Sequence, residues 1–321
     1  MKNFQAGMAA DVRKSARLDK RGRAGSGWRM RCFFLFCCCL FCCAPRAAWG
    51  GPPVQEASAE DAVNLYCLRL AYPVVRALEP DGDGGQWLVL ADGRRVLYSR
   101  ARGEGEGREF PADPWDVDVR ASMADLYPLE PERPATPEGV APGRRRSYAL
   151  LAALYGSDAR QVGKGLRTAH VLGQPVRLAA TAARALQKVE PRLAESVREQ
   201  PELRALLKPD GGFLWRRVAG EQRLSPHAYG VALDLSARRA PYWRWSRLRP
   251  HPMQQSYPSA IVAAFEAEGF IWGGKWHEYD LMHFEYRPEL ICKARILRGL
   301  EKMNAADATT GGAMMKEGIR P

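Results

Sequence analysis

Two short runs constrain the fold of this 321-residue chain more than any other feature. The run at residues 225–235 has the sequence SPHAYGVALDL, and the run at residues 272–286 has the sequence WGGKWHEYDLMHFEY. The first run contains His227 and Asp234, and the second contains Asp280 and His283, with spacings that are compatible with a shared site. A single such pair is more often a chance pairing or a hydrogen-bonded core pair, so the evidence comes from the whole pattern.

Both runs have the pattern of short β-strands. Residues 231–235 are apolar around Asp234, and residues 282–286 alternate between apolar and polar side chains. Because side chains alternate along a strand, His283 and Glu285 are expected on the same face. Gly230 allows the chain to turn before the first of these strands. The two strands can therefore place several imidazole and carboxylate groups in one cavity.

The residue types in this cavity predict a metal site. Two imidazoles and one carboxylate, from His227, His283 and Asp234, suit Zn²⁺ and leave a fourth position open. Asp280 lies just before the second strand and can act as a general base beside the metal. Glu278 is the alternative base. The residues alone therefore predict a zinc hydrolase.

The complete pattern is Ser-x-His-x-x-Gly-x-Ala-x-Asp followed by Trp-Gly-Gly-x-Trp and Asp-x-Met-His-Phe-Glu. It resembles the zinc D-Ala-D-Ala carboxypeptidase family, which includes the vancomycin-resistance D,D-carboxypeptidases and dipeptidases and the phage L-alanyl-D-glutamate endolysins. This family shares a fold with the hedgehog signalling domain. The resemblance continues upstream through residues 213–220 and 223–224, and it covers approximately residues 147–295.

The resemblance assigns a role to individual residues. It implies that His227, Asp234 and His283 bind one Zn²⁺ ion and that Asp280 is the general base. Some family members carry glutamate at the position of Asp280.

Residues around this group receive supporting roles. Arg216 matches the arginine that binds a substrate carboxylate, although the adjacent Arg217 makes this assignment ambiguous. Ser225 is expected to hydrogen-bond the substrate or to orient the neighbouring histidine. Glu285 is expected to accept a hydrogen bond from a ligating imidazole. His277 is either a proton donor or a surface residue.

The resemblance also implies a fold and an activity. The fold is α+β, with a small antiparallel sheet that carries the zinc site, flanking helices, and a small amino-terminal α/β extension. The expected activity is hydrolysis of peptidoglycan stem peptides, foremost as a D-alanyl-D-alanine carboxypeptidase. An endopeptidase that cuts within the stem peptide and a non-catalytic zinc-containing wall-binding domain are the alternatives. A monomer is expected.

The amino-terminal segment predicts export. Basic residues precede the uninterrupted apolar run at residues 32–43, and small residues follow it at residues 44–50. This order is typical of a signal peptide, and the apolar run is short for a membrane span. The basic region is long, so we expect translation to begin at Met30; a lipoprotein cleavage before Cys42 or Cys43 is the alternative. Residues 1–50 are therefore predicted to direct the protein to the periplasm or cell envelope, and the membrane is a partner only through this segment.

The positive charge lies mostly in that segment. The chain carries a formal charge of +12, of which +8 lies in residues 1–50 and +4 in the remainder. This small residual charge does not favour nucleic acid as a partner. Six of the eight cysteines also lie in the predicted signal segment. The remaining two, Cys67 and Cys292, either form a disulfide in an oxidising compartment or stay unpaired.

We expect an extension and proline-rich linker at residues 51–145, a zinc peptidase domain at 146–300 and an unstructured tail at 301–321. The prolines between residues 127 and 143 indicate either a linker or an extended segment wrapped over the surface. The arginines at 144–146 are expected in a solvated loop, with contact to an anionic wall polymer as the alternative. The segment 241–250 interleaves aromatic and basic residues, which suits either a cleft wall or a cap on the core. The predicted elements are helices at 57–70, 176–197 and 258–268 and a hairpin at 87–98.

Overall fold

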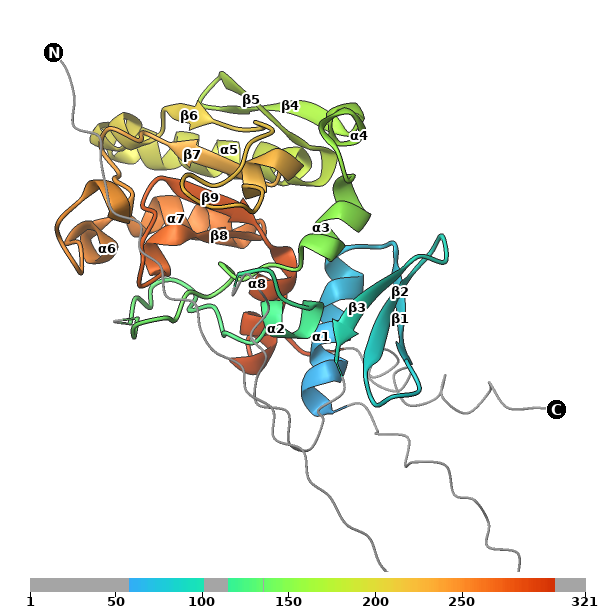
Figure 1. Ribbon diagram of the computed structural model, residues 1–321. Helices are drawn as coiled ribbons and strands as arrows, with labels where there is room; N and C mark the ends of the chain where they lie inside the picture. The colour runs from blue at the N-terminus through green and yellow to red at the C-terminus, as the bar shows by residue number, and fades with distance from the viewer. Residues whose placement is uncertain (1–57, 101–114, 135, 304–321) are drawn as a thin grey trace, which may run out of the picture. The chain divides into compact units, whose positions relative to one another are not determined.

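The computed structural model describes residues 58–100, 115–134 and 136–303 (Figure 1). All described residues belong to one structural unit. The predicted signal segment at 1–50 and most of the predicted tail at 301–321 lie outside the described residues. No helix within the described part of the chain is long and apolar enough to cross a membrane.

The described chain begins with a helix and a three-stranded antiparallel sheet. Ser58 caps the helix, because its hydroxyl accepts a hydrogen bond from the backbone of Asp61 while the Asp61 carboxylate bonds back to Ser58. The predicted hairpin turns at Asp92 and Gly93 and is confirmed, but a further strand precedes it that the sequence did not reveal. The elements are α1 (Ala59–Ala71), β1 (Val75–Pro80), β2 (Gln86–Leu90) and β3 (Arg95–Ser99).

This amino-terminal part shares a hydrophobic core with the end of the chain. Helix α1 packs on α8 (Pro288–Leu297), and the disulfide Cys67–Cys292 joins the two helices, with 5.5 Å between the Cα atoms. Ile271 contributes to the same core. The boundary expected near residue 145 therefore does not separate two hydrophobic cores.

A helical region follows, and one of its boundaries differs from the prediction. The predicted helix at 176–197 is a helix only from residue 180, because residues 174–179 pair as a strand with residues 166–171. Alternation of buried Val176 and Leu178 with exposed Arg177 accounts for the strand. The elements here are α2 (Val119–Ser122), α3 (Tyr148–Tyr155), α4 (Ala159–Lys164), β4 (Leu166–Val171), β5 (Gln174–Ala179), α5 (Ala180–Glu199) and the 3₁₀ turn η1 (Pro201–Leu206).

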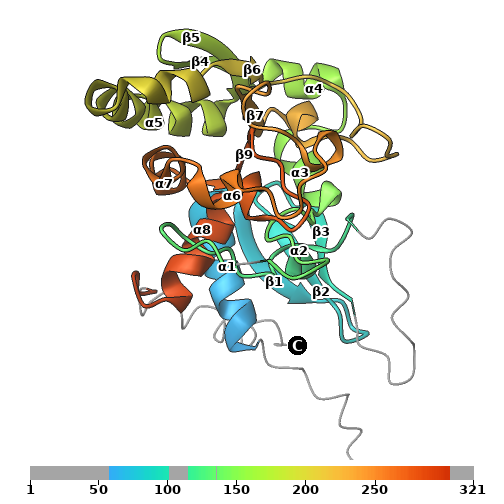
Figure 2. The same cartoon turned by 90° about the vertical axis from the view of Figure 1, so that its left-hand side faces the viewer.

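The second half of the chain builds a four-stranded antiparallel sheet with the order β6-β7-β9-β8. Helices α5 and α7 pack in its main core, and both views show them beside each other (Figure 2). The predicted α+β fold with small antiparallel sheets is confirmed. The elements are β6 (Pro209–Gly211), η2 (Pro226–Tyr229), β7 (Ala232–Leu235), η3 (Trp243–Trp245), α6 (Met253–Ser256), α7 (Ser259–Ala267), β8 (Phe270–Trp272), η4 (Gly273–Lys275) and β9 (His283–Tyr286).

The proline-rich segment at residues 127–143 is held against this half by buried polar contacts. The Tyr127 hydroxyl donates a hydrogen bond of 2.7 Å to Glu266. Lys275 lies 2.6 Å from Glu266 and 3.1 Å from Glu130, and its side chain is almost fully buried. Of the two alternatives raised by the prolines, the structure shows the extended segment wrapped over its neighbours.

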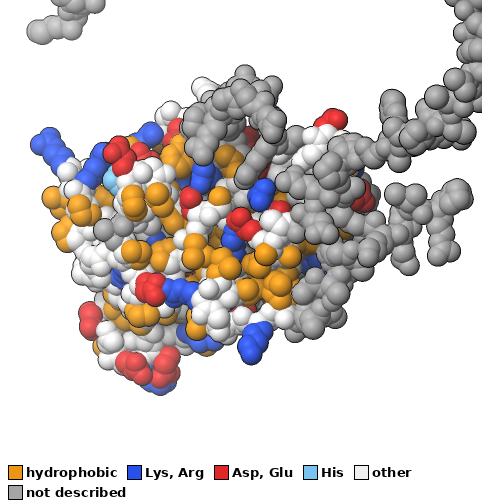
Figure 3. All heavy atoms as spheres, turned by 90° about the horizontal axis from the view of Figure 1, so that it is seen from below, with side chains coloured by type: hydrophobic (Ala, Val, Ile, Leu, Met, Phe, Trp, Pro, Cys, Tyr) orange, Lys and Arg blue, Asp and Glu red, His pale blue; other side chains and the backbone are white. Residues whose placement is uncertain are grey.

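The surface seen in Figure 3 mixes side chains of all types. Lysine and arginine side chains are interspersed with acidic and hydrophobic ones on the part of this face that the structure describes. They do not form a continuous basic surface there.

Candidate metal centre

Three predicted ligands meet at the centre of the four-stranded sheet. Strands β7 and β9 pair antiparallel in a register that sets Asp234 opposite His283. The turn η2, directly before β7, carries His227. The ligand atoms of the three side chains all lie within 4.8 Å of one another. Asp234 Oδ1 is 3.2 Å from His227 Nε2 and 3.1 Å from His283 Nδ1.

The local backbone explains how His227 reaches this position. The Ser225 hydroxyl caps the turn by accepting a hydrogen bond from the backbone N–H of His227, and Pro226 occupies its first position. Gly230 ends the turn with a φ of 68°. A side chain at Gly230 would lie 2.8 Å from the Ala179 backbone nitrogen, so a residue with a Cβ does not fit without movement.

Hydrogen bonds fix the orientation of both imidazoles. His227 Nδ1 lies 2.8 Å from the Gly212 carbonyl oxygen, which requires the proton on Nδ1 and leaves Nε2 free toward Asp234. His283 Nε2 lies 3.3 Å from Glu285 Oε2, so Nδ1 is the nitrogen that faces Asp234. Partners of this kind typically orient imidazoles that bind a metal. Glu285 therefore lies beside His283 and faces the imidazole nitrogen that is turned away from Asp234.

Glu285 is part of a buried charged network. Arg146 donates from Nε to Glu285 Oε1 at 2.8 Å, and Arg287 lies 3.7 Å from the same carboxylate. Burial alone would raise the pKa of Glu285, but Arg146 and the other partners hold the pKa well below its usual range. The carboxylate thus stays ionised and remains an acceptor for His283.

The three side chains shift one another's ionisation. Burial opposes ionisation of Asp234, yet the two histidines lower the pKa of its carboxyl. Burial lowers the pKa of His283, but hydrogen bonds to Asp234 and Glu285 outweigh burial and raise it to about 9. Two imidazole nitrogens and an ionised carboxylate form a donor set that suits Zn²⁺.

Asp280 lies in the same cavity as the ligands. This cavity has a volume of about 130 Å³. Burial raises the pKa of the Asp280 carboxyl to about 7, and its Oδ1 is buried without a hydrogen-bond partner among the described residues. Glu278, the alternative base, instead pairs with Arg144 and lines a neighbouring cavity. Geometry therefore favours Asp280 as the group that can move a proton.

Some of the remaining candidate residues line the metal cavity, and others lie outside it. Arg216 and Ser225 line the metal cavity, and Arg216 is exposed at its edge. Arg217 does not line this cavity and bonds to Gln222. His277 is exposed and lines the neighbouring cavity.

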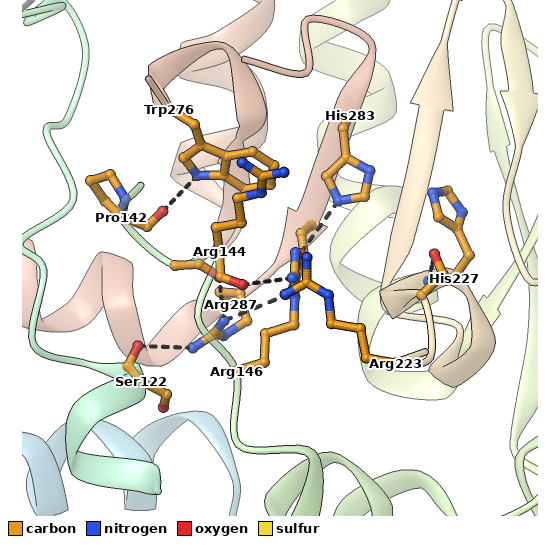
Figure 4. A network of polar contacts seen from close by, with 12 residues as sticks. Ser122, Pro142, Arg144, Arg146, Arg223, His227, Trp276, His283 and Arg287 are labelled. Atoms are coloured by element: carbon orange, nitrogen blue, oxygen red, sulfur yellow. Dashed lines mark hydrogen bonds and ion pairs between the residues drawn. The ribbon is translucent and has the colours of Figure 1, made fainter. Parts of the chain in front are cut away.

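The arginines at 144–146 were expected in a solvated loop, and this prediction is wrong for two of them. Arg144 and Arg146 are only 5% and 4% exposed, and both line the metal cavity together with Arg223. Figure 4 shows the guanidinium groups of Arg146 and Arg223 next to each other, near His283. Acidic partners far away in the sequence accompany this burial: Arg146 pairs with the fully buried Glu285, and Arg144 pairs with the half-buried Glu278.

Comparison with known proteins gives one match. Residues 219–286 match the family model described as D-alanyl-D-alanine carboxypeptidase. The match confirms the family resemblance found in the sequence, and it includes the three potential ligands and Asp280. It supports a peptidase that acts on peptidoglycan. No match was found among curated proteins or among solved structures.

Proposed function

We propose that this protein is a zinc-dependent D-alanyl-D-alanine carboxypeptidase that trims peptidoglycan stem peptides. One observation carries the proposal: the Asp280 carboxyl shares a cavity with a His227–Asp234–His283 group that suits Zn²⁺. A domain that only binds the cell wall does not need a buried base with a raised pKa at this position.

Each residue of the cavity has a role in this mechanism. When bound, Zn²⁺ supplies Lewis acidity, which polarises the scissile carbonyl and makes water a stronger nucleophile. Asp280 accepts the proton from the attacking water and delivers it to the leaving amine nitrogen. A base with a pKa of about 7 suits both transfers near neutral pH. Arg216, at the edge of the cavity, pairs with the terminal carboxylate of the substrate.

We also propose that the protein works outside the cytoplasm. The disulfide between Cys67 and Cys292 supports this location, because such bonds persist in oxidising compartments. The predicted signal segment at residues 1–50 is consistent with it.

The test is mass spectrometry of muropeptides incubated with the zinc-loaded protein. Loss of one alanine from pentapeptides, absent after EDTA treatment and absent with Asp280→Asn, is the expected result. Release of larger stem fragments would replace the carboxypeptidase with an endopeptidase. No cleavage by a protein that demonstrably holds zinc would refute the proposed function.

A further inference from the structure

A second cavity adjoins the metal cavity. The residues matched by the family model include only some of those that line this second cavity. It has a volume of about 220 Å³, and Arg144 lines both cavities. Trp115, Glu138 and Arg144 come from the segment before the matched residues, whereas Trp243 and Arg249 come from the segment at 241–250. The volume is below the ~300 Å³ at which pockets for whole small molecules begin, so it suits one side chain of a larger substrate.

Arg144 forms the wall between the cavities and is already engaged. Its guanidinium stacks at 4.7 Å over Trp115 and at 5.8 Å over Trp276, as Figure 4 shows for the latter. It also pairs with Glu278. These contacts satisfy the charge of Arg144. Recognition of a charged ligand in the second cavity therefore depends on the other charged side chains that line this cavity.

Two charged side chains of this cavity lack an ion-pair partner within the described chain. Arg249 stacks over Trp243 at 4.4 Å, a geometry that fixes the guanidinium and leaves its N–H groups available for a carboxylate. Glu138 is exposed and can accept from an ammonium group. Trp115 and Trp243 supply aromatic surface for methylene groups between these two ends.

We propose that this cavity binds a substrate side chain that ends in an amino acid group, with an ammonium and a carboxylate on one carbon. The inference rests on the proposed function, because the adjoining metal cavity would hold the scissile bond of the same stem peptide. Arg249 pairs with the side-chain carboxylate, and Glu138 pairs with the ammonium group. The segment at 241–250 is thus a cleft wall that selects the substrate.

The test compares two pentapeptides that end in D-alanyl-D-alanine. One carries meso-diaminopimelate at its third position, and the other carries L-lysine, which lacks only the side-chain carboxylate. We expect kcat/KM to be about tenfold higher for the diaminopimelate peptide, the effect of one charge-assisted hydrogen bond. Arg249→Ala should abolish this preference while retaining activity on the lysine peptide. The control Arg247→Ala, on the same segment but outside the cavity, should keep the preference.

Binding to the zinc-free protein provides a second measurement that does not depend on hydrolysis. Calorimetry with a tripeptide that ends in meso-diaminopimelate should show weaker binding for both Arg249→Ala and Glu138→Gln, whereas only Arg249→Ala should remove the difference from the lysine tripeptide. Equal cleavage and equal binding of both peptides would refute the inference and leave the proposed function intact. Cleavage of neither peptide would refute the proposed function and the inference together.

Discussion

Replacing Glu285 with glutamine should separate two roles of the buried network. The side chains of Glu285 and Arg146 are both buried. Glutamine preserves the shape but removes the charge, so two buried guanidinium groups, of Arg146 and Arg287, lose their shared carboxylate. Breaking a buried ion pair in this way costs about 3–5 kcal/mol of unfolding free energy.

The same change should weaken zinc binding. Loss of the partner of a ligating imidazole typically costs about 10–100-fold in metal affinity, and Glu285 is the partner of His283 Nε2. Urea unfolding of the zinc-free protein measures the first effect. Competition with a chromophoric chelator measures the second, after circular dichroism has shown that the variant is folded.

Glu289→Gln is the matched control. Glu289 is also buried, pairs with Arg287 at 2.5 Å and accepts a hydrogen bond from Tyr72, but it does not contact the three potential ligands. We expect Glu289→Gln to lower the unfolding free energy and to leave zinc affinity unchanged. If Glu285→Gln bound zinc as tightly as the unaltered protein, the proposed orientation of His283 by Glu285 would be wrong.

Three further predictions concern the base, the disulfide and pH. Asp280→Asn should lower kcat by about 10²–10⁴-fold without changing zinc affinity, and retained turnover would exclude this role. Reducing Cys67–Cys292, which are 225 residues apart, should lower the unfolding free energy by up to about 5 kcal/mol; an unchanged urea midpoint would contradict this. Since the pKa of His283 is raised to about 9, zinc must displace its proton at lower pH, and affinity should fall about tenfold per unit from pH 8 to pH 6. Competition with a chelator across this pH range tests whether zinc affinity falls as the pH falls, and a pH-independent affinity would refute this prediction.

The centre of the site could be predicted because its signals are local. The alternation in residues 282–286 placed His283 and Glu285 on one face, and the structure shows both on β9. Gly230 marked the turn before β7, where the structure has a positive φ. These features depend on neighbouring residues, so a single sequence contains them.

The surroundings of the site could not be predicted because they depend on distant partners. Arg146 reaches Glu285 across 139 residues, and nothing in a run of three arginines indicates such a partner. The same limitation applies to β5, where Val176 and Leu178 fit either a helix or a strand until the pairing with β4 is known. The sequence alone could not decide whether Cys67 and Cys292 form a disulfide or stay as free thiols, because only the packing of α1 on α8 brings them together.

The disulfide affects the resistance of the protein to proteolysis. Cys67 and Cys292 close a covalent ring that contains His227, Asp234 and His283. A single peptide-bond cut within the ring opens it but does not divide the molecule, so both pieces remain attached and can stay folded on each other. Without the disulfide, the same cut would leave two pieces with no covalent link between them. With it, a protein exposed to endopeptidases would tolerate a first cut.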